Sequence, residues 1–423
     1  MLINFGVAKG LLRNSGFNVF RYPEYRLFWV AAAFSNIGMW ALIYGRLWLM
    51  HQLTDSPLMV GLVSTASLGP VLLFSVWGGA IADRVNRLRL VRWTRGMFAA
   101  LAVLTGLLIF TDVIQAWHVF AVSAATGVLL AFDIPSRSAM IPALVPRAQL
   151  ASAIALYSLV FGGAAIVGPA ILSPLVDLWG LEGVFFLIGA AYALTVLFLM
   201  LMSPSGHKPM NRSVTVVRGI IEGFQYVRNH TTILGVLAIS IVAGVFGNSF
   251  EALLPVYADK ILAGGIGTYS RLLLSAGVGG LIATITIAVL GTRVRPVWFF
   301  VSAGIGYGLG ILALSQLSWF PGAALNLGMI GAFHVVFSTM SITLVQTLTA
   351  DQFRGRIMGI QQLSWGATAV GGAVMGAMAE AWGVAFALSL GGLILAVATV
   401  AIAAVSLRGS NTREIEAHPK PAV

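Results

Sequence analysis

The chain has 423 residues, of which 58% are hydrophobic and 9% charged, with a mean hydropathy of +0.92 and a formal net charge of +11. This composition excludes a soluble globular protein, and the lack of cysteine excludes disulfides, thiolate metal sites and thiol catalysis. All the basic residues except Arg46, Lys260 and Arg271 fall in the termini or in alternate loops. That asymmetry orients membrane proteins, so the positive charge does not indicate nucleic-acid binding.

Apolar windows of about 20 residues, the length of a helical span, recur along nearly the whole chain. Residues 1–26 are mixed and basic and precede no small-residue cleavage site, so no cleavable signal is expected. We expect an all-α membrane protein of twelve transmembrane helices with both ends in the cytoplasm. The expected spans are 27–53, 58–79, 90–111, 114–134, 151–176, 183–202, 233–257, 268–290, 297–315, 321–345, 357–379 and 384–407.

An internal repeat indicates two pseudo-symmetric six-helix bundles. A shift of 204 residues places Gly168 on Gly372, and a shift of 203 places Asp177-Leu178-Trp179-Gly180 on Glu380-Ala381-Trp382-Gly383. Parallel repeats of this kind are a known transporter plan. The expected parts are a cytoplasmic N-terminal segment at 1–26, a bundle at 27–202, a cytoplasmic linker with a surface helix at 203–232, a second bundle at 233–407 and a cytoplasmic tail at 408–423.

A charged stretch, Gly78–Arg89, separates the second and third spans and predicts a tight cytoplasmic hairpin. Topology requires its bases but not its acid, Asp83. We expect Asp83 to bind the positive end of the eleventh helix, which is expected to start just after Arg354-Gly355-Arg356. At the inner end of the fourth span, Asp133 and Arg137 bracket Pro135. These groups would hold the cytoplasmic side closed; the alternative is that they only mark a membrane face.

Two ionisable residues, Arg46 and Glu251, lie inside spans, where charge is costly and functional by default. Each is about 27–28 Å from the inner boundary at the rise of an α-helix, and the two correspond under the repeat. They could pair when the outer mouth is shut, or each could snorkel separately to the interface. Glu251 could alternatively carry a proton or contact a cationic substrate.

Near the middle of the tenth span, His334 could relay protons, or it could be a buried histidine bonded to a carbonyl. Polar side chains of the first and seventh spans could face a cavity or join helices as interhelical contacts. They are Ser35, Asn36, Ser240 and Asn248. A metalloprotease motif and a nucleotide-binding loop are both missing from the sequence, so an enzyme, a cofactor, a metal site and ATP-driven transport are not expected.

The hairpin resembles the loop after the second helix of the major facilitator superfamily, Gly-x-Leu-Ala-Asp-Arg-x-Gly-Arg-Arg/Lys, and Asn86 stands at its second glycine. The matching residues are Gly79, Ile81, Ala82, Asp83, Arg84 and Arg87. The runs Phe132–Arg137, Ile141–Pro146 and Phe353–Ile360 are similar to the branch of enterobactin exporters and macrolide efflux proteins. Gly168-Pro169 resembles the kink of antiporters, with Leu172 and Ser173 where further glycines are usual.

This resemblance implies alternating access around a central cavity and export in exchange for protons. We therefore expect a proton-coupled exporter of amphipathic small molecules, drugs or siderophores, acting as a monomer in a bacterial inner membrane. The expected partners are the substrate, protons and lipid, without nucleic acid. A lysophospholipid flippase or importer on the same fold is an alternative, as is a transport-inactive sensor or scaffold; a membrane enzyme is disfavoured by the missing catalytic set.

Overall fold

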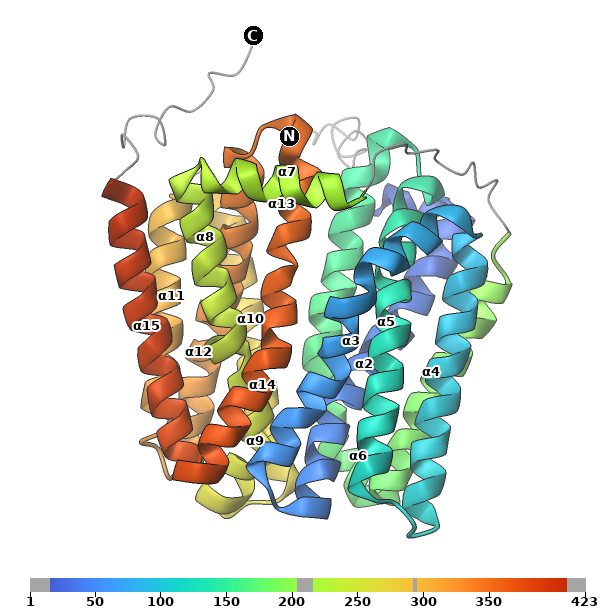
Figure 1. The fold of residues 1–423 in the computed structure, drawn as a ribbon. Helices are drawn as coiled ribbons and strands as arrows, with labels where there is room; N and C mark the ends of the chain where they lie inside the picture. Colours follow the sequence, from blue (N-terminus) through green and yellow to red (C-terminus); the bar gives the residue numbers. More distant parts are fainter. Residues whose placement is uncertain (1–15, 204–215, 292–294, 409–423) are drawn as a thin grey trace, which may run out of the picture. The chain divides into compact units, whose positions relative to one another are not determined.

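The computed structural model describes residues 16–203, 216–291 and 295–408, and these form helices joined by short turns (Figure 1). In this part of the chain, ten helical segments are long and apolar enough to cross a membrane. One of them contains α6 (Leu150–Met200), whose 51 residues are interrupted at Gly180, where φ is 69°. Read as two spans, α6 would raise the number of crossings, and the 20-residue α14 (Leu363–Trp382) lies outside the ten. The count of twelve stays a prediction.

The helices largely follow the apolar windows, because a backbone in lipid must satisfy its own hydrogen bonds. The first half of the chain contains η1 (Gly16–Arg21), α2 (Pro23–Thr54), α3 (Pro57–Arg84), α4 (Arg87–Phe110), α5 (Ala116–Leu144), η2 (Arg147–Gln149) and α6. The second contains α7 (Val216–Arg228), α8 (Thr231–Val242), η3 (Ala243–Gly247), η4 (Asn248–Leu253), α9 (Leu254–Val256), η5 (Tyr257–Ile261), α10 (Ile266–Leu290), α11 (Pro296–Leu314), α12 (Phe320–Leu348), α13 (Asp351–Gln361), α14 and α15 (Val384–Arg408).

Packing divides the chain into two compact units. The first comprises Met1–Gly45, Leu73–His118 and Ala125–Asn211, and the second comprises Arg46–Leu72, Val119–Ala124 and Arg212–Val423. Helices α2, α3 and α5 therefore contribute to both units. The predicted bundle boundaries stay a prediction.

In the first unit, α2 packs on α6 through aromatic and small residues. Tyr25 donates to the carbonyl of Ala153 at 2.8 Å, and the Phe28 and Tyr157 rings stack 5.8 Å apart. Further along, a Cβ on Gly168 would come within 2.8 Å of the Trp40 Cβ atom. Only a glycine permits the two helices to approach this closely, because any side chain there would collide with the neighbouring helix.

In the second unit, glycines bring helix pairs into backbone contact. Gly279 of α10 faces Gly328 of α12, and Gly308 of α11 faces Gly392 of α15. Such small-residue contacts replace the hydrophobic driving force, which is weak between helices already in lipid. They fix the frame in which the polar groups of the second unit are held.

Span seven departs from the expected uniform helix. After α8, the chain forms a π-helical turn at η3, a 3₁₀ segment at η4 and a second π-helical turn at η5. Hydropathy does not distinguish these turns from an α-helix. Interruptions of this kind mark hinges and functional sites.

Two further segments can be compared with the expected ones. The linker contains a helix, α7 (Val216–Arg228), where a surface helix was expected, and its position on the membrane surface stays a prediction. The expected eleventh span at 357–379 is wrong at its start, because a separate helix, α13, covers Asp351–Gln361 before α14 begins at Leu363. Arg354 and Arg356 thus lie on a helix and not ahead of one.

Candidate functional site

A buried ionic cluster occupies the first unit around Asp133 of α5, which is fully buried. Its carboxylate accepts from the Arg95 guanidinium at 2.5 Å and from the Thr94 hydroxyl at 2.9 Å, and Arg137 Nε lies 3.6 Å away. Arg137 in turn donates to Asn36 Oδ1 of α2 at 3.2 Å. The arrangement ties α2, α4 and α5 together through charge.

Arg95 was expected to be a loop base, and this was wrong. It lies two turns inside α4, is 1% exposed, and its guanidinium sits over the Phe98 and Tyr192 rings at 5.4 and 5.7 Å. Buried arginine is stable there because Asp133 neutralises it and aromatic faces attract its charge. Its position inside the expected third span was a usable signal, since a charge in a span is a functional candidate.

The fourth span also ends later than expected, at Leu144 instead of residue 134, and Pro135 and Pro142 lie within the helix. Asp133 and Arg137 are therefore one turn apart inside α5 and not at its end. Asn36, proposed as either cavity-lining or interhelical, is fully buried and accepts a hydrogen bond from Arg137. That contact joins α2 to α5, which favours the interhelical alternative.

The hairpin after α3 is shorter than expected, because α3 continues to Arg84 and α4 begins at Arg87. Asn86 caps α4 by accepting from the Arg89 backbone N–H at 3.0 Å. Arg84 is exposed, whereas Arg87 donates to the Ala139 carbonyl at 3.1 Å. The surroundings of Gly79 and Asp83 lie outside the described residues, so the Asp83 gate stays a prediction.

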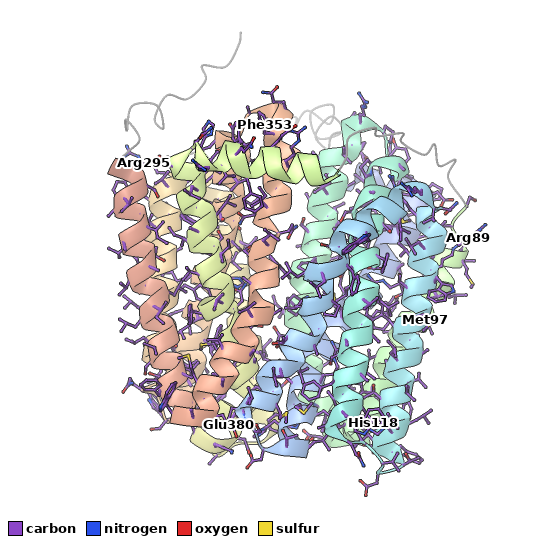
Figure 2. The ribbon with its side chains drawn as sticks, viewed as in Figure 1. Arg89, Met97, His118, Arg295, Phe353 and Glu380 are labelled. Atoms are coloured by element: carbon purple, nitrogen blue, oxygen red, sulfur yellow. The ribbon has the colours of Figure 1, made fainter. Side chains whose placement is uncertain are left out.

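The remaining predicted gate residues have definite positions. Gly168 and Pro169 are both buried within α6, with Gly168 against α2. On α13, Arg354 donates to the Gln346 carbonyl at 3.1 Å, and Arg356 donates to Glu222 of α7 at 2.5 Å. In the second unit, Phe353 of α13 and Glu380 of α14 lie at opposite ends of the segment formed by α13 and α14 (Figure 2).

A second polar cluster forms around the interrupted seventh span and includes Glu251, which lies on η4 and is partly buried. Glu251 interacts electrostatically with the phenols of Tyr269 on α10 and Tyr307 on α11. Tyr307 donates to Asn248 Oδ1 at 3.2 Å, and its ring stacks on His334 of α12 at 5.3 Å. The structure thus brings together three residues that the sequence singled out separately: Asn248, Glu251 and His334.

Arg46 is 3% exposed on α2 and belongs to the second unit. Two residues further along α2, the Trp48 ring stacks on Tyr269 at 5.6 Å, and Tyr269 is one of the phenols that interact with Glu251. Because the Arg46 side chain is buried, its guanidinium does not extend freely to the membrane interface, which argues against the snorkelling alternative. The pairing of Arg46 with Glu251 stays a prediction.

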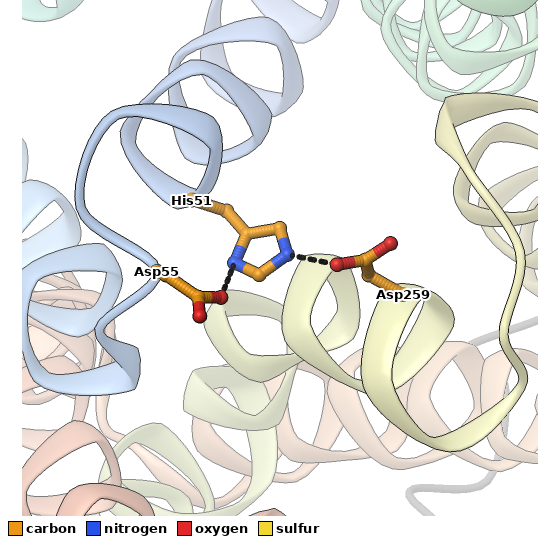
Figure 3. A group of neighbouring side chains, drawn as sticks. All are labelled: His51, Asp55 and Asp259. Carbon is orange, nitrogen blue, oxygen red and sulfur yellow. Dashed lines mark hydrogen bonds and ion pairs between the residues drawn. The ribbon is translucent and has the colours of Figure 1, made fainter.

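A third group, which the sequence does not reveal, consists of His51, Asp55 and Asp259 (Figure 3). His51 Nε2 lies 3.0 Å from Asp259 Oδ2, and His51 Nδ1 lies 3.9 Å from Asp55 Oδ1. The 208 residues that separate His51 from Asp259 hide this contact from any local pattern. The only signal was a histidine near the end of an apolar span.

Comparisons with known proteins agree with this architecture. A family model described as "Transmembrane secretion effector" matches residues 14–422. The chain is 24% identical to the "Staphyloferrin A transporter" of Staphylococcus aureus, over 84% of this chain and 90% of the relative. It is 26% identical to the "Multidrug efflux pump Tap" of Mycolicibacterium fortuitum, over 88% and 93%. It is 25% identical to the "Enterobactin exporter EntS" of Escherichia coli, over 84% of each.

Solved structures support the same fold. A bacterial homologue of the human lysosomal transporter Spinster, in an inward-facing and occupied conformation, superposes with a TM-score of 0.75 at 13% identity, over 95% of this chain and 99% of the other. A peptide transporter, POT, gives 0.73 at 13% identity, over 91% and 94%. The matched family and the curated relatives are membrane transporters and not enzymes.

Proposed function

Because this chain belongs to the transmembrane secretion effector family of the major facilitator superfamily, we propose that it is a proton-coupled exporter of amphipathic small molecules, drugs or siderophores. It acts as a monomer in a bacterial inner membrane, with twelve helices in two bundles, cytoplasmic termini and alternating access. The names of the relatives, two exporters and one siderophore transporter, support the substrate class.

The observation that carries this proposal is the position of Glu251. A carboxylate in a membrane span is expensive and is retained for a function. Glu251 lies where the helix departs from α geometry, and it interacts electrostatically with the phenols of Tyr269 and Tyr307. Because this segment already alternates between π and 3₁₀ turns, its helical pitch can change without the loss of a regular α-helix. A proton on Glu251 removes the local charge, so this segment can respond to protonation by repacking.

The other polar groups take supporting roles. Arg46 stabilises the ionised form of Glu251, and His334, whose ring stacks on that of Tyr307, takes part in proton transfer. Asn248 positions that phenol. The Asp133 cluster keeps the first unit rigid, while Asp83 and the Arg356–Glu222 pair close the cytoplasmic side. The energy suffices: one proton crossing about 100 mV yields about 2.3 kcal/mol, enough for a roughly 50-fold gradient of an uncharged solute.

Purified protein in liposomes, with a pH gradient imposed across the membrane, tests the proposal. We expect a cationic drug or a siderophore to move against its gradient, in step with protons taken up from the acidic side. Glu251→Gln abolishes the proton-driven movement but permits downhill exchange, whereas the control Glu24→Gln, at the start of α2, behaves as wild type. Substrate movement that ignores the pH gradient would refute proton coupling. Movement of lysophospholipid alone would indicate a flippase, and no movement of any compound would indicate a sensor or scaffold.

A further inference from the structure

His51, at the end of α2, is enclosed by two carboxylates, one on each side of its ring (Figure 3). Nε2 lies 3.0 Å from Asp259 Oδ2 of η5, and Nδ1 lies 3.9 Å from Asp55 Oδ1 in the turn between α2 and α3. The imidazole is only 3% exposed, whereas the side chains of Asp55 and Asp259 are 70% and 47% exposed. His51 is therefore a buried base that two solvent-accessible acids face.

The charges of this group balance only when His51 is protonated. Lys260 Nζ lies 3.0 Å from Asp55 Oδ1 and also donates to the Asp55 backbone carbonyl at 3.1 Å. Two carboxylates and one ammonium leave one negative charge with a neutral imidazole and none with an imidazolium. A neutral imidazole also has a single N–H, so it can donate to only one of its two acids, whereas an imidazolium donates from both nitrogens. His51 Nδ1 has no hydrogen-bond partner at its present distance.

Besides Lys260, the neighbouring elements contribute aromatic rings and one further acid. On α2 itself, the Trp48 ring meets the His51 ring edge-on at 5.7 Å, and Tyr269 of α10 stacks behind Trp48. From α14, Glu380 accepts from the Ser56 hydroxyl at 2.8 Å and from the Leu58 N–H at 3.3 Å. The α2–α3 turn is thus held by η5 on one side and by α14 on the other, and only the η5 contact contains a histidine among the described residues.

We infer that His51 is a proton-binding site whose imidazolium bridges Asp55 and Asp259 and so fastens the α2–α3 turn to η5. Loss of the proton removes one of the two bridging contacts and leaves a net negative charge among the acids, which loosens the turn. Of the ordinary side chains, imidazole changes charge between about pH 5 and 8, the range in which such a fastening would be useful. The site is separate from Glu251, and Asp259 and Lys260 lie on η5, the π turn that follows it.

A divalent cation fits this group less well. One ligand atom from each of the three residues lies within 4.8 Å of the others. However, the two nitrogens of His51 face different carboxylates, so one ion could not use the imidazole and both acids without turning the ring. Lys260 already neutralises Asp55. The geometry suits a proton, which an imidazolium shares with both sides at once.

The inference rests on the proposed proton-coupled export and deepens it. In that cycle the α2–α3 turn faces the outside, where the medium is acidic. After the exporter releases its substrate to the outside, His51 would bind a proton and the α2–α3 turn would attach to η5, so proton binding would close the outer side. The outer side would be closed only after the substrate has left.

The test uses distance measurement and does not depend on transport. The chain contains no cysteine, so Gln52→Cys and Ala263→Cys, both exposed, place two spin labels on either side of the contact without further changes. The distance between the two spin labels is measured by pulsed electron–electron double resonance in lipid nanodiscs from pH 5 to 8. We expect the ratio of short to long distances to fall about fivefold as pH rises, the size expected for the loss of one partly exposed ion pair.

Three variants define the outcome. In His51→Gln the distance distribution becomes independent of pH, and in Asp259→Asn its pH dependence falls by about half or more because one acid remains, whereas in the control His230→Gln it stays as in wild type. An unchanged pH response in His51→Gln and Asp259→Asn would overturn the inference. So would a short-distance population that needs Zn²⁺ and disappears with a chelator at constant pH. If the labels respond as expected but liposome transport ignores the pH gradient, proton coupling fails and the proton site stands.

Discussion

Replacing Asp133 with asparagine should be one of the most destabilising single changes in the first unit. The change keeps the shape of the side chain but removes the negative charge that faces Arg95 and Arg137. Asp133 and Arg95 are 0% and 1% exposed, and Arg137 is 7% exposed. Water therefore cannot replace the lost carboxylate.

The magnitude follows from that burial. Removing one partner of a buried ion pair typically costs about 3–5 kcal/mol, because the remaining charge stays uncompensated. Two arginines lose their partner here, and Thr94 loses its acceptor, so the upper part of that range is expected. A protein with a total stability of about 5–15 kcal/mol would lose about a quarter of it or more.

Equilibrium unfolding in mixed micelles measures this cost, with the fluorescence of the 11 tryptophans as the signal. The matched control is Glu222→Gln, which breaks the Arg356 pair, where both side chains are about one-third exposed. Such pairs contribute about 0.2–1 kcal/mol. Combining Asp133→Asn with Arg95→Met should recover part of the loss, because it removes one of the stranded charges. If Asp133→Asn costs no more than Glu222→Gln, the buried cluster does not have the electrostatic role assigned to it.

Three further outcomes are expected. Exchanging Arg46 and Glu251 in one chain should restore transport lost in either single variant, and a double variant as inactive as the singles would rule out their pairing. Gly168→Ala should lower the free energy of unfolding by about 1–3 kcal/mol in the same assay, because its methyl group overpacks α2. Gly162→Ala on the same helix has open space around it and should be neutral or stabilising by up to about 1 kcal/mol. Equal effects of the two variants would contradict the close contact at Gly168. Tyr307→Phe should lower proton-driven transport several-fold and leave downhill exchange unchanged, and a loss of both would indicate a structural role.

The helical fold and the family were predictable from the sequence because lipid imposes a length and a composition on every span. The turn between α3 and α4 was predictable because its motif is local, while the gate role of Asp83 stays a prediction. The same reasoning failed for Arg95, since counting it among the loop bases hid the fact that it lies inside a predicted span. It failed again at η3 and η5, because π turns and α turns have the same apolar content.

Partners were harder to predict than positions. Asn36 and Arg137 are 101 residues apart, and Asn248 and Tyr307 are 59 apart, so each contact depends on how helices pack and not on local spacing. Sequence identified Asn36, Asn248, Glu251 and His334 as unusual because polar groups are rare in spans. It could not identify Tyr307 or Tyr269, because tyrosine in a membrane protein is unremarkable until a carboxylate is found beside it.

The three polar clusters differ in one respect that bears on mechanism. The Asp133 cluster is closed to water and has an acid between two bases, so its charge is fixed and its role is to hold helices. The His51 cluster has an imidazole between two partly exposed acids, and the Glu251 cluster has a carboxylate that interacts with two phenols, so the charge of each cluster can change. Both lie on or against the stretch from η3 to η5, where the helical pitch alternates. Protonation at either place would therefore act on the same irregular segment, which lets two separate protonation sites influence one movement.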